Sequence, residues 1–168
     1  RRSSPRVAAP NDSLRWQEEA SARAELPRPG AARRRAFTFE RAGMTLTGSF
    51  VYEPLPPLSE TGEGRYPIVL FIYPCWVYPC STIGWDILST AVAAQGFVVV
   101  TYAPQRGADA EADIDDLIAL IALLKQNRLS AQGDGARFAV AGGSLTSIHV
   151  WRLAQVNHEM RALVALGG

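Results

Sequence analysis

Apolar and polar positions along the chain follow two periods, and each is typical of one kind of regular structure. Between residues 37 and 52 apolar and polar residues alternate around Ala42-Gly43, which predicts an antiparallel hairpin. Later apolar runs are continuous, as is typical of strands that are buried on both faces. These runs cover residues 68–73, 97–102, 138–141 and 163–166.

Helical patterns separate the continuous runs. In residues 109–128 apolar residues recur at three- and four-residue spacing, which predicts a helix. Its early acids, Asp113, Asp115 and Asp116, point to different faces, so we interpret them as a solvated helix start and not as a metal site. Further helices are expected over 83–95 and 145–157, and a turn at Gly133 to Gly135. Strands that alternate with helices predict an α/β class, a hairpin followed by a mostly parallel sheet with helices on both faces.

The first 35 residues differ from the rest of the chain. They contain nine arginines and four acids, a net charge of +5, whereas residues 36–168 carry −4. We therefore divide the chain into a basic arm, 1–35, with one short helix over 14–26, and a domain, 36–168. The arm has too little apolar surface to order itself, so we expect its arginines to bind other protein subunits or a membrane surface. The arginines in question are Arg1, Arg2, Arg6, Arg33, Arg34 and Arg35.

Composition excludes several classes of protein. With 168 residues, 48% of them hydrophobic, the chain can bury a core, yet no apolar run reaches the roughly 18 residues of a membrane span. A net charge of +1 gives no reason to expect nucleic acid. Two cysteines cannot form a four-ligand zinc site, and the chain shows no cofactor motif.

The chain begins with Arg1 and not with Met. The stretch from Arg1 to Arg6 is rich in Arg and Ser and contains no acid, as in the remnant of an organelle transit peptide. An arbitrary starting point explains it equally well. The first interpretation places a soluble or peripheral protein in a plastid or mitochondrion, and the second leaves the cytoplasm open.

A glycine-rich turn carries the clearest candidate chemistry. Gly142-Gly143-Ser144 follows a predicted buried strand and precedes a predicted helix. A serine on such a turn resembles the nucleophile elbow, where small neighbours let the serine adopt unusual dihedral angles. The helix start behind it favours developing negative charge.

Three stretches extend this likeness. Residues 64–71, 93–100 and 139–144 resemble the third strand, the passage into the fourth strand and the approach to the nucleophile of α/β-hydrolases, in particular of chlorophyllase and dienelactone-hydrolase-like esterases. The resemblance covers residues 36–168, about the first two-thirds of that fold. It implies that Ser144 is the nucleophile and that the backbone N–H of Leu145 is one oxyanion-hole donor.

The chain departs from this pattern in two places. Where the family carries His-Gly after its third strand, this chain has Tyr73-Pro74, and proline has no N–H to donate. The N–H of Cys75 is then the candidate for the second oxyanion donor. Thr146 replaces the last glycine of the elbow, so packing at the helix start must differ there.

The acid and histidine of a catalytic triad follow the serine in this fold, and neither has appeared by Gly168. His149 lies on the serine's own helix, and His158 follows that helix at its far end. We interpret both as helix-surface or loop histidines, so this chain alone is expected to lack triad-level activity.

Other features of the loop after residue 73 leave alternatives open. Cys75 and Cys80 are either joined in a disulfide, left as free thiols or part of a small-ligand site. Nearby aromatic residues either line an apolar pocket for an acyl or pigment-like ligand or belong to the core, which we favour. These aromatics are Trp76, Tyr78 and Trp85.

Three functional hypotheses follow. The first is a pseudoenzyme, a catalytically impaired α/β-hydrolase that serves as a scaffold or accessory subunit of an organellar protein complex, attached through the basic arm and the apolar edge strand near residue 166. The second is the N-terminal part of an active serine esterase. The third is a small-ligand or pigment-binding module. Taking 168 residues as the whole protein, we favour the scaffold.

Overall fold

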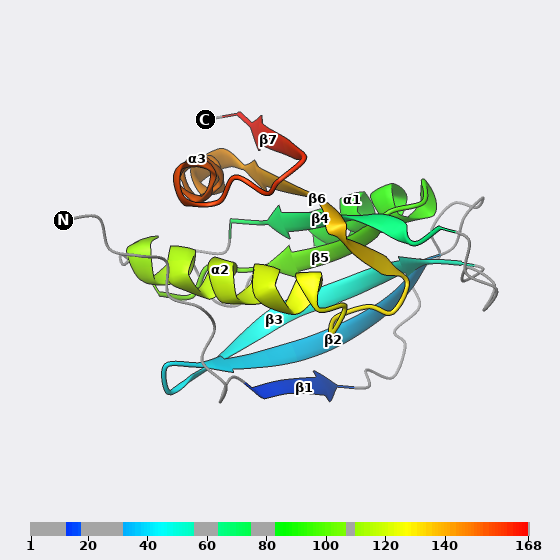
Figure 1. Cartoon of the computed structure of the whole chain (residues 1–168), viewed down its shortest axis with the longest axis horizontal. Helices are drawn as coiled ribbons and strands as arrows, with labels where there is room; N and C mark the ends of the chain where they lie inside the picture. Colours follow the sequence, from blue (N-terminus) through cyan, green and yellow to red (C-terminus); the bar gives the residue numbers. More distant parts are fainter. Residues whose placement is uncertain (1–12, 18–31, 56–63, 75–82, 107–109, 168) are drawn as a thin grey trace.

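The computed structural model describes residues 13–17, 32–55, 64–74, 83–106 and 110–167. Within these residues, seven strands form one sheet, and helices lie on both of its faces (Figure 1). The strands are β1 (Ser13–Gln17), β2 (Ala32–Arg41), β3 (Met44–Pro54), β4 (Tyr66–Ile72), β5 (Val98–Tyr102), β6 (Gly133–Gly143) and β7 (Ala162–Leu166). The helices are α1 (Ile83–Ala94), α2 (Ala110–Lys125) and α3 (Ser147–Val156), and α3 is preceded by a 3-10 turn, η1 (Ser144–Thr146).

The sheet is antiparallel at one side and parallel at the other. Its order is β1-β2-β3-β5-β4-β6-β7, with antiparallel pairs from β1 to β5 and parallel pairs from β5 to β7. The predicted hairpin is β2 and β3, joined through Ala42 and Gly43, which both have positive φ. The predicted fold class, an α/β fold with an antiparallel hairpin followed by parallel strands, is confirmed.

Alternate residues of β4 face two separate parts of the core. Ile68, Leu70 and Ile72 belong to the cluster that α2 and α3 cover. Phe71 and Tyr73 face the other way, into the smaller cluster covered by α1. Both faces of β4 are buried, which is why its sequence is continuously apolar instead of alternating.

Residues 13–17 form a strand, although their composition predicts a helix. β1 pairs antiparallel with β2, with Leu14 opposite Phe39 and Trp16 opposite Phe37. The helix predicted over 14–26 is therefore wrong at its start, and residues 18–31 lie outside the described part. Edge pairing with β2 outweighs a helix propensity worth only tenths of a kcal/mol per residue.

The predicted turn at Gly133 to Gly135 is also wrong, because these residues form the beginning of β6. Their glycines allow close packing instead of a reversal of the chain. A Cβ at Gly135 would lie 2.6 Å from the carbonyl oxygen of Leu124, and one at Gly133 would lie 2.8 Å from Cδ1 of Ile68. The start of β6 thus packs so closely on β4 and on the end of α2 that a side chain would not fit at these two positions.

The two outer strands of the described sheet are β1 and β7 (Figure 1). β7 is apolar but open to solvent, with Val164 43% and Leu166 47% exposed. The apolar run 163–166 predicted a strand buried on both faces, and that prediction is wrong. None of the described helices is both long and apolar enough to cross a membrane.

Candidate functional site

The serine of the glycine-rich turn stands at the carboxyl end of β6. Ser144 begins η1 directly after the strand ends, and its φ is +55°. A positive φ costs an L-residue roughly 1–2 kcal/mol, so the surrounding structure must enforce it. Ser144 is exposed, and no hydrogen bond joins its side chain to another described residue. The turn therefore presents a strained serine whose hydroxyl is open to a ligand.

The two glycines before Ser144 are required by space. A Cβ at Gly142 would lie 2.6 Å from Cγ2 of Val150 and 2.9 Å from the carbonyl oxygen of Thr146. A Cβ at Gly143 would lie 2.8 Å from the indole of Trp85. α3 on one side and α1 on the other thus press on the backbone that leads into Ser144. The turn is enclosed on both sides just before the serine.

Leu145 follows the serine in η1, and its side chain is exposed. Its N–H lies in the first turn of the helical segment, where unpaired amide groups and the helix dipole favour an anion. Leu145 thus directly follows Ser144 at the start of a helical segment. Its role in catalysis stays a prediction.

The resemblance assigns the second oxyanion donor to the loop after β4, the strand next to β6. β4 ends beside the elbow, with Ile72 opposite Gly142. The N–H of Tyr73 donates to the carbonyl of Tyr102 at 3.1 Å, and Pro74 has no N–H, so neither can serve. Cys75, the predicted donor, and its suggested disulfide partner Cys80 lie outside the described residues.

Tyr73 is a core residue and not a ligand for an oxyanion. Its side chain is buried and its hydroxyl donates to the carbonyl of Gly48 on β3. Burial, followed by the negative charge of Asp86, raises the pKa of Tyr73 to about 12. Where the related fold has a histidine, this chain thus has a neutral phenol that anchors the end of β4 to β3.

Thr146 is the functional candidate that sequence analysis missed. It was noted only as a departure from the glycine pattern, but it is fully buried and its hydroxyl makes three close polar contacts. The N–H of Gly143 donates to Oγ1 at 3.0 Å, and the carbonyl oxygens of Ile72 and Gly143 lie 2.7 and 2.8 Å from it. The hydroxyl of Thr146 therefore links the residue before Ser144 to the end of β4.

Neither histidine is brought to Ser144. His149, predicted to be on the surface, is 2% exposed, and its Nε2 lies 3.5 Å from Oδ2 of Asp113 on α2. Its ring therefore faces the interface between α2 and α3. His158 is exposed and precedes β7, at the end of the strand remote from the elbow. The expectation that neither acts as the base stays a prediction.

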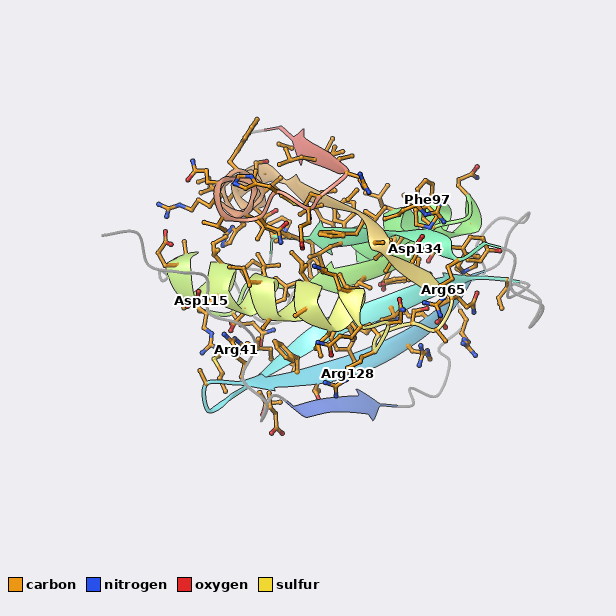
Figure 2. All side chains as sticks on the ribbon, in the orientation of Figure 1. Arg41, Arg65, Phe97, Asp115, Arg128 and Asp134 are labelled. Carbon is orange, nitrogen blue, oxygen red and sulfur yellow. The ribbon has the colours of Figure 1, made fainter. Side chains whose placement is uncertain are left out.

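Two of the three acids that we expected to form a solvated start of α2 are buried. Asp115 is exposed, whereas Asp113 and Asp116 are 0% and 2% exposed. Asp116 accepts from Nε of Arg106 at 2.7 Å and lies 3.6 Å from Nε of Arg41, which Figure 2 shows between the hairpin end of β2 and α2. This buried ion pair joins α2 to the hairpin. No group of metal-ligating side chains occurs among the described residues.

Asp113 accepts a hydrogen bond from the hydroxyl of Tyr102 at 2.9 Å. Burial raises its pKa, but the neighbouring His149 and hydrogen bonds from Tyr102 and two backbone N–H groups outweigh burial and lower the pKa overall. Asp113 is therefore held as a carboxylate. The cluster is a structural one, formed by side chains from elements far apart in the sequence.

Arg33, Arg34 and Arg35, three of the arginines that we expected to bind a partner, lie in β2 and have partners within the domain. Nη2 of Arg33 lies 2.6 Å from the buried Glu53, and Nη2 of Arg35 lies 3.2 Å from it. Arg34 stacks on the ring of Phe50 at 3.8 Å. Binding of a second protein by these three stays a prediction, and Arg1, Arg2 and Arg6 lie outside the described residues.

Trp85 is part of the core, as favoured above. Its ring centroid lies 5.2 Å from that of Phe71 and 6.4 Å from that of Tyr73. It fills the space above Gly143 and so supports the elbow from the α1 side. Trp76 and Tyr78 lie outside the described residues, and a ligand pocket formed with them stays a prediction.

No protein-family model and no curated protein sequence matches this chain. Solved structures do match. A hypothetical protein from Pseudomonas aeruginosa matches with a TM-score of 0.67 and 19% identity over 90% of this chain and 47% of its own. A candidate dienelactone hydrolase from Klebsiella pneumoniae subsp. pneumoniae matches with a TM-score of 0.58 and 14% identity over 79% of this chain and 58% of its own. A double mutant of the esterase rPPE matches with a TM-score of 0.56 and 18% identity over 74% of this chain and 38% of its own.

These matches, each below 20% identity, show the fold and not the activity. The chain has the α/β-hydrolase fold, dienelactone hydrolase- and esterase-like, over the part that it covers, as the resemblance implied. It spans between 38% and 58% of the length of these three structures.

Proposed function

We propose that this chain is the nucleophile-bearing part of a carboxylic-ester hydrolase, with Ser144 as the nucleophile. One observation carries the proposal, the exposed serine at φ +55° between a parallel strand and a helix start. Strain of this kind persists only where surrounding contacts impose it, and it is concentrated at functional sites. Unlike Ala42, which also has a positive φ, Ser144 carries a nucleophilic hydroxyl.

In the proposed reaction Oγ of Ser144 attacks the carbonyl carbon of an ester. A base takes the hydroxyl proton, the alcohol leaves with a proton, and water then hydrolyses the acyl-serine. The N–H of Leu145 donates to the oxyanion that forms at each addition step. Since His149 faces Asp113 and His158 lies at the opposite end of β7, we propose that the base and its acid come from polypeptide outside these 168 residues.

A second candidate is the catalytically impaired scaffold or accessory subunit of a larger, organellar complex. The observation that favours it is the donor arrangement after β4, where Tyr73 uses its N–H on Tyr102 and Pro74 has none. The exposed apolar residues of β7 are a surface that other subunits could cover. The two candidates differ in one property, the reactivity of Ser144.

That property is tested with a fluorophosphonate, which phosphonylates activated serines. In the intact protein purified from its source, we expect one adduct, mapped to Ser144 by peptide mass spectrometry and absent from Ser144→Ala. Ser147→Ala is the matched control, because Ser147 lies one turn further along but is buried. Intact, folded protein without an adduct, under conditions that fully label an active esterase, would support the scaffold instead.

A further inference from the structure

Thr146 joins the elbow to the neighbouring strand through a single hydroxyl. Oγ1 accepts a hydrogen bond from the N–H of Gly143, the residue before the serine. Its own hydrogen has two carbonyl acceptors within reach, Ile72 at 2.7 Å and Gly143 at 2.8 Å. A hydroxyl has one hydrogen and two lone pairs, so it can satisfy the Gly143 amide and a carbonyl at the same time. The contact to Ile72 spans 74 positions of sequence and ties η1 to the end of β4.

The peptide group between Ile72 and Tyr73 is held from both sides as a result. Its carbonyl faces Oγ1 of Thr146, and its N–H donates to Tyr102 on β5 at 3.1 Å. The loop to which the resemblance assigns the second oxyanion donor follows this peptide in the sequence. The peptide before that loop is thus held against the serine turn by one buried side chain.

Burial makes this link hard to replace. Thr146 is 0% exposed, so water cannot take over its contacts, and an unpaired buried amide or carbonyl is costly. A glycine, the residue of the related motif, would leave the Gly143 amide without this partner. The departure from the motif therefore adds a connection that the motif residue cannot make.

We propose that Thr146 is a positioning residue whose hydroxyl fixes the Ser144 turn against the Ile72–Tyr73 peptide. It acts through Gly143 and Ile72 and does not touch the substrate. The effect of Thr146 on the reactivity of Ser144 rests on the proposed function, whereas its effect on the geometry of the turn does not. Fluorophosphonate labelling tests the first effect, and amide hydrogen exchange tests the second.

The variants are Thr146→Val, which keeps the shape and removes the hydroxyl, and Thr146→Ser, which restores the hydroxyl. Thr101→Val is the matched control. Thr101 is a buried threonine of β5 whose Oγ1 accepts the N–H of Phe50 at 2.9 Å, away from the turn. In the intact protein we would measure the rate constant of fluorophosphonate labelling and the amide exchange of the peptide that contains Gly143.

We expect labelling of Thr146→Val to be about tenfold slower than wild type, because a small displacement of a reacting group is enough for such a loss. Exchange in the Gly143 peptide should rise in this variant. Thr146→Ser should stay close to wild type in both, and Thr101→Val should match wild type in both, although its unfolding temperature falls. If Thr146→Val fails to fold, Thr146→Ser against Thr146→Ala provides the same contrast.

Wild-type labelling and exchange in Thr146→Val would overturn the proposal. Equal losses in Thr146→Ser and Thr146→Val would also overturn it, since the hydroxyl would not be the cause. Wild-type protein that is not labelled, together with faster Gly143 exchange in Thr146→Val, would remove the proposed esterase function and leave the positioning role of Thr146 supported.

Discussion

Two tight turns of this molecule place a non-glycine residue at a similar positive φ, but they differ in how the residue is held. In the hairpin between β2 and β3, Ala42 has φ +49°, and around the next residue, Gly43, a Cβ would meet nothing within 4 Å. In the elbow, Ser144 has φ +55°, and the two preceding glycines have no room for a Cβ. The hairpin tolerates its strain, whereas the elbow enforces it.

The two strained residues also differ in the chemistry of their side chains. Ala42 has a methyl group and offers no chemistry, so a glycine would serve as well in its place. Ser144 carries a hydroxyl, and α1, α3 and β4 all contact the segment around it. Enclosure of the backbone together with exposure of the side chain is what a nucleophile requires. Variants in and around the two turns test this contrast.

The largest effect is expected for Gly142→Ala. Its new methyl group would meet Cγ2 of Val150 and the carbonyl oxygen of Thr146, and backbone atoms cannot move aside as side chains do. We expect the unfolding free energy to fall by about 3 kcal/mol. We also expect fluorophosphonate labelling of Ser144 to be lost. Chemical denaturation measures the first. Gly43→Ala is the control, since it adds backbone strain without a clash and should cost about 1 kcal/mol with no loss of labelling. Equal costs for the two variants would remove the contrast.

Glu53→Gln tests whether the hairpin side is independent of the elbow. Glu53 is buried and accepts from Ser130, Arg33 and Arg35, so removal of its charge should cost about 2 kcal/mol. Labelling of Ser144 should not change. A tenfold loss of labelling in folded protein would contradict the separation of the two regions.

The same residue predicts a pH dependence. Burial raises the pKa of Glu53, but hydrogen bonds from Ser130 and Arg33 and the charges of Arg35 and Arg33 outweigh it and lower the pKa overall. A lowered pKa contributes stability above the pKa of the unfolded chain, and that stability is lost as the pH falls below about 4. Denaturation curves between pH 7 and 3 should therefore converge for wild type and Glu53→Gln. A constant difference down to pH 3 would contradict this assignment.

The smallest effects are expected for relief of strain. Glycine at position 42 or 144 removes roughly 1–2 kcal/mol of backbone strain and costs about 0.5–1 kcal/mol of chain entropy. Ala42→Gly and Ser144→Gly should thus each stabilise the protein by about 0.5 kcal/mol, measured as a rise in unfolding temperature. Only Ser144→Gly should abolish labelling. Destabilisation by Ser144→Gly would show that the serine side chain supports the turn.

Sequence patterns were sufficient for the parts of the fold that depend on local burial. The runs 68–73 and 97–102 are apolar because β4 and β5 are covered on both faces, and Gly142-Gly143-Ser144 indicated the elbow because close packing requires small residues. β1 was not predictable in this way, since its strand exists through pairing with β2. Pairing between distant segments leaves no periodic mark in a short segment.

Buried polar groups were not predictable for a related reason. In the sequence Asp116 resembles any solvated acid at a helix start, but in the structure it pairs with Arg41 of β2 and with Arg106, which follows β5. Thr146 resembles a poor match to a glycine until the carbonyl of Ile72 lies within 2.7 Å of it. In each case the partner is 10 or more positions away in the chain. A single sequence does not say which distant groups converge.

The central claim is that the strained turn exists to make Ser144 reactive. The most direct measurement is the initial rate of hydrolysis of a short-chain p-nitrophenyl ester by the intact protein, compared between wild type and Ser144→Ala. We expect turnover by wild type and a fall of about a thousandfold or more in the variant, because removal of a nucleophile leaves only the contribution of binding and the oxyanion hole. Equal rates in the two folded proteins would contradict the account.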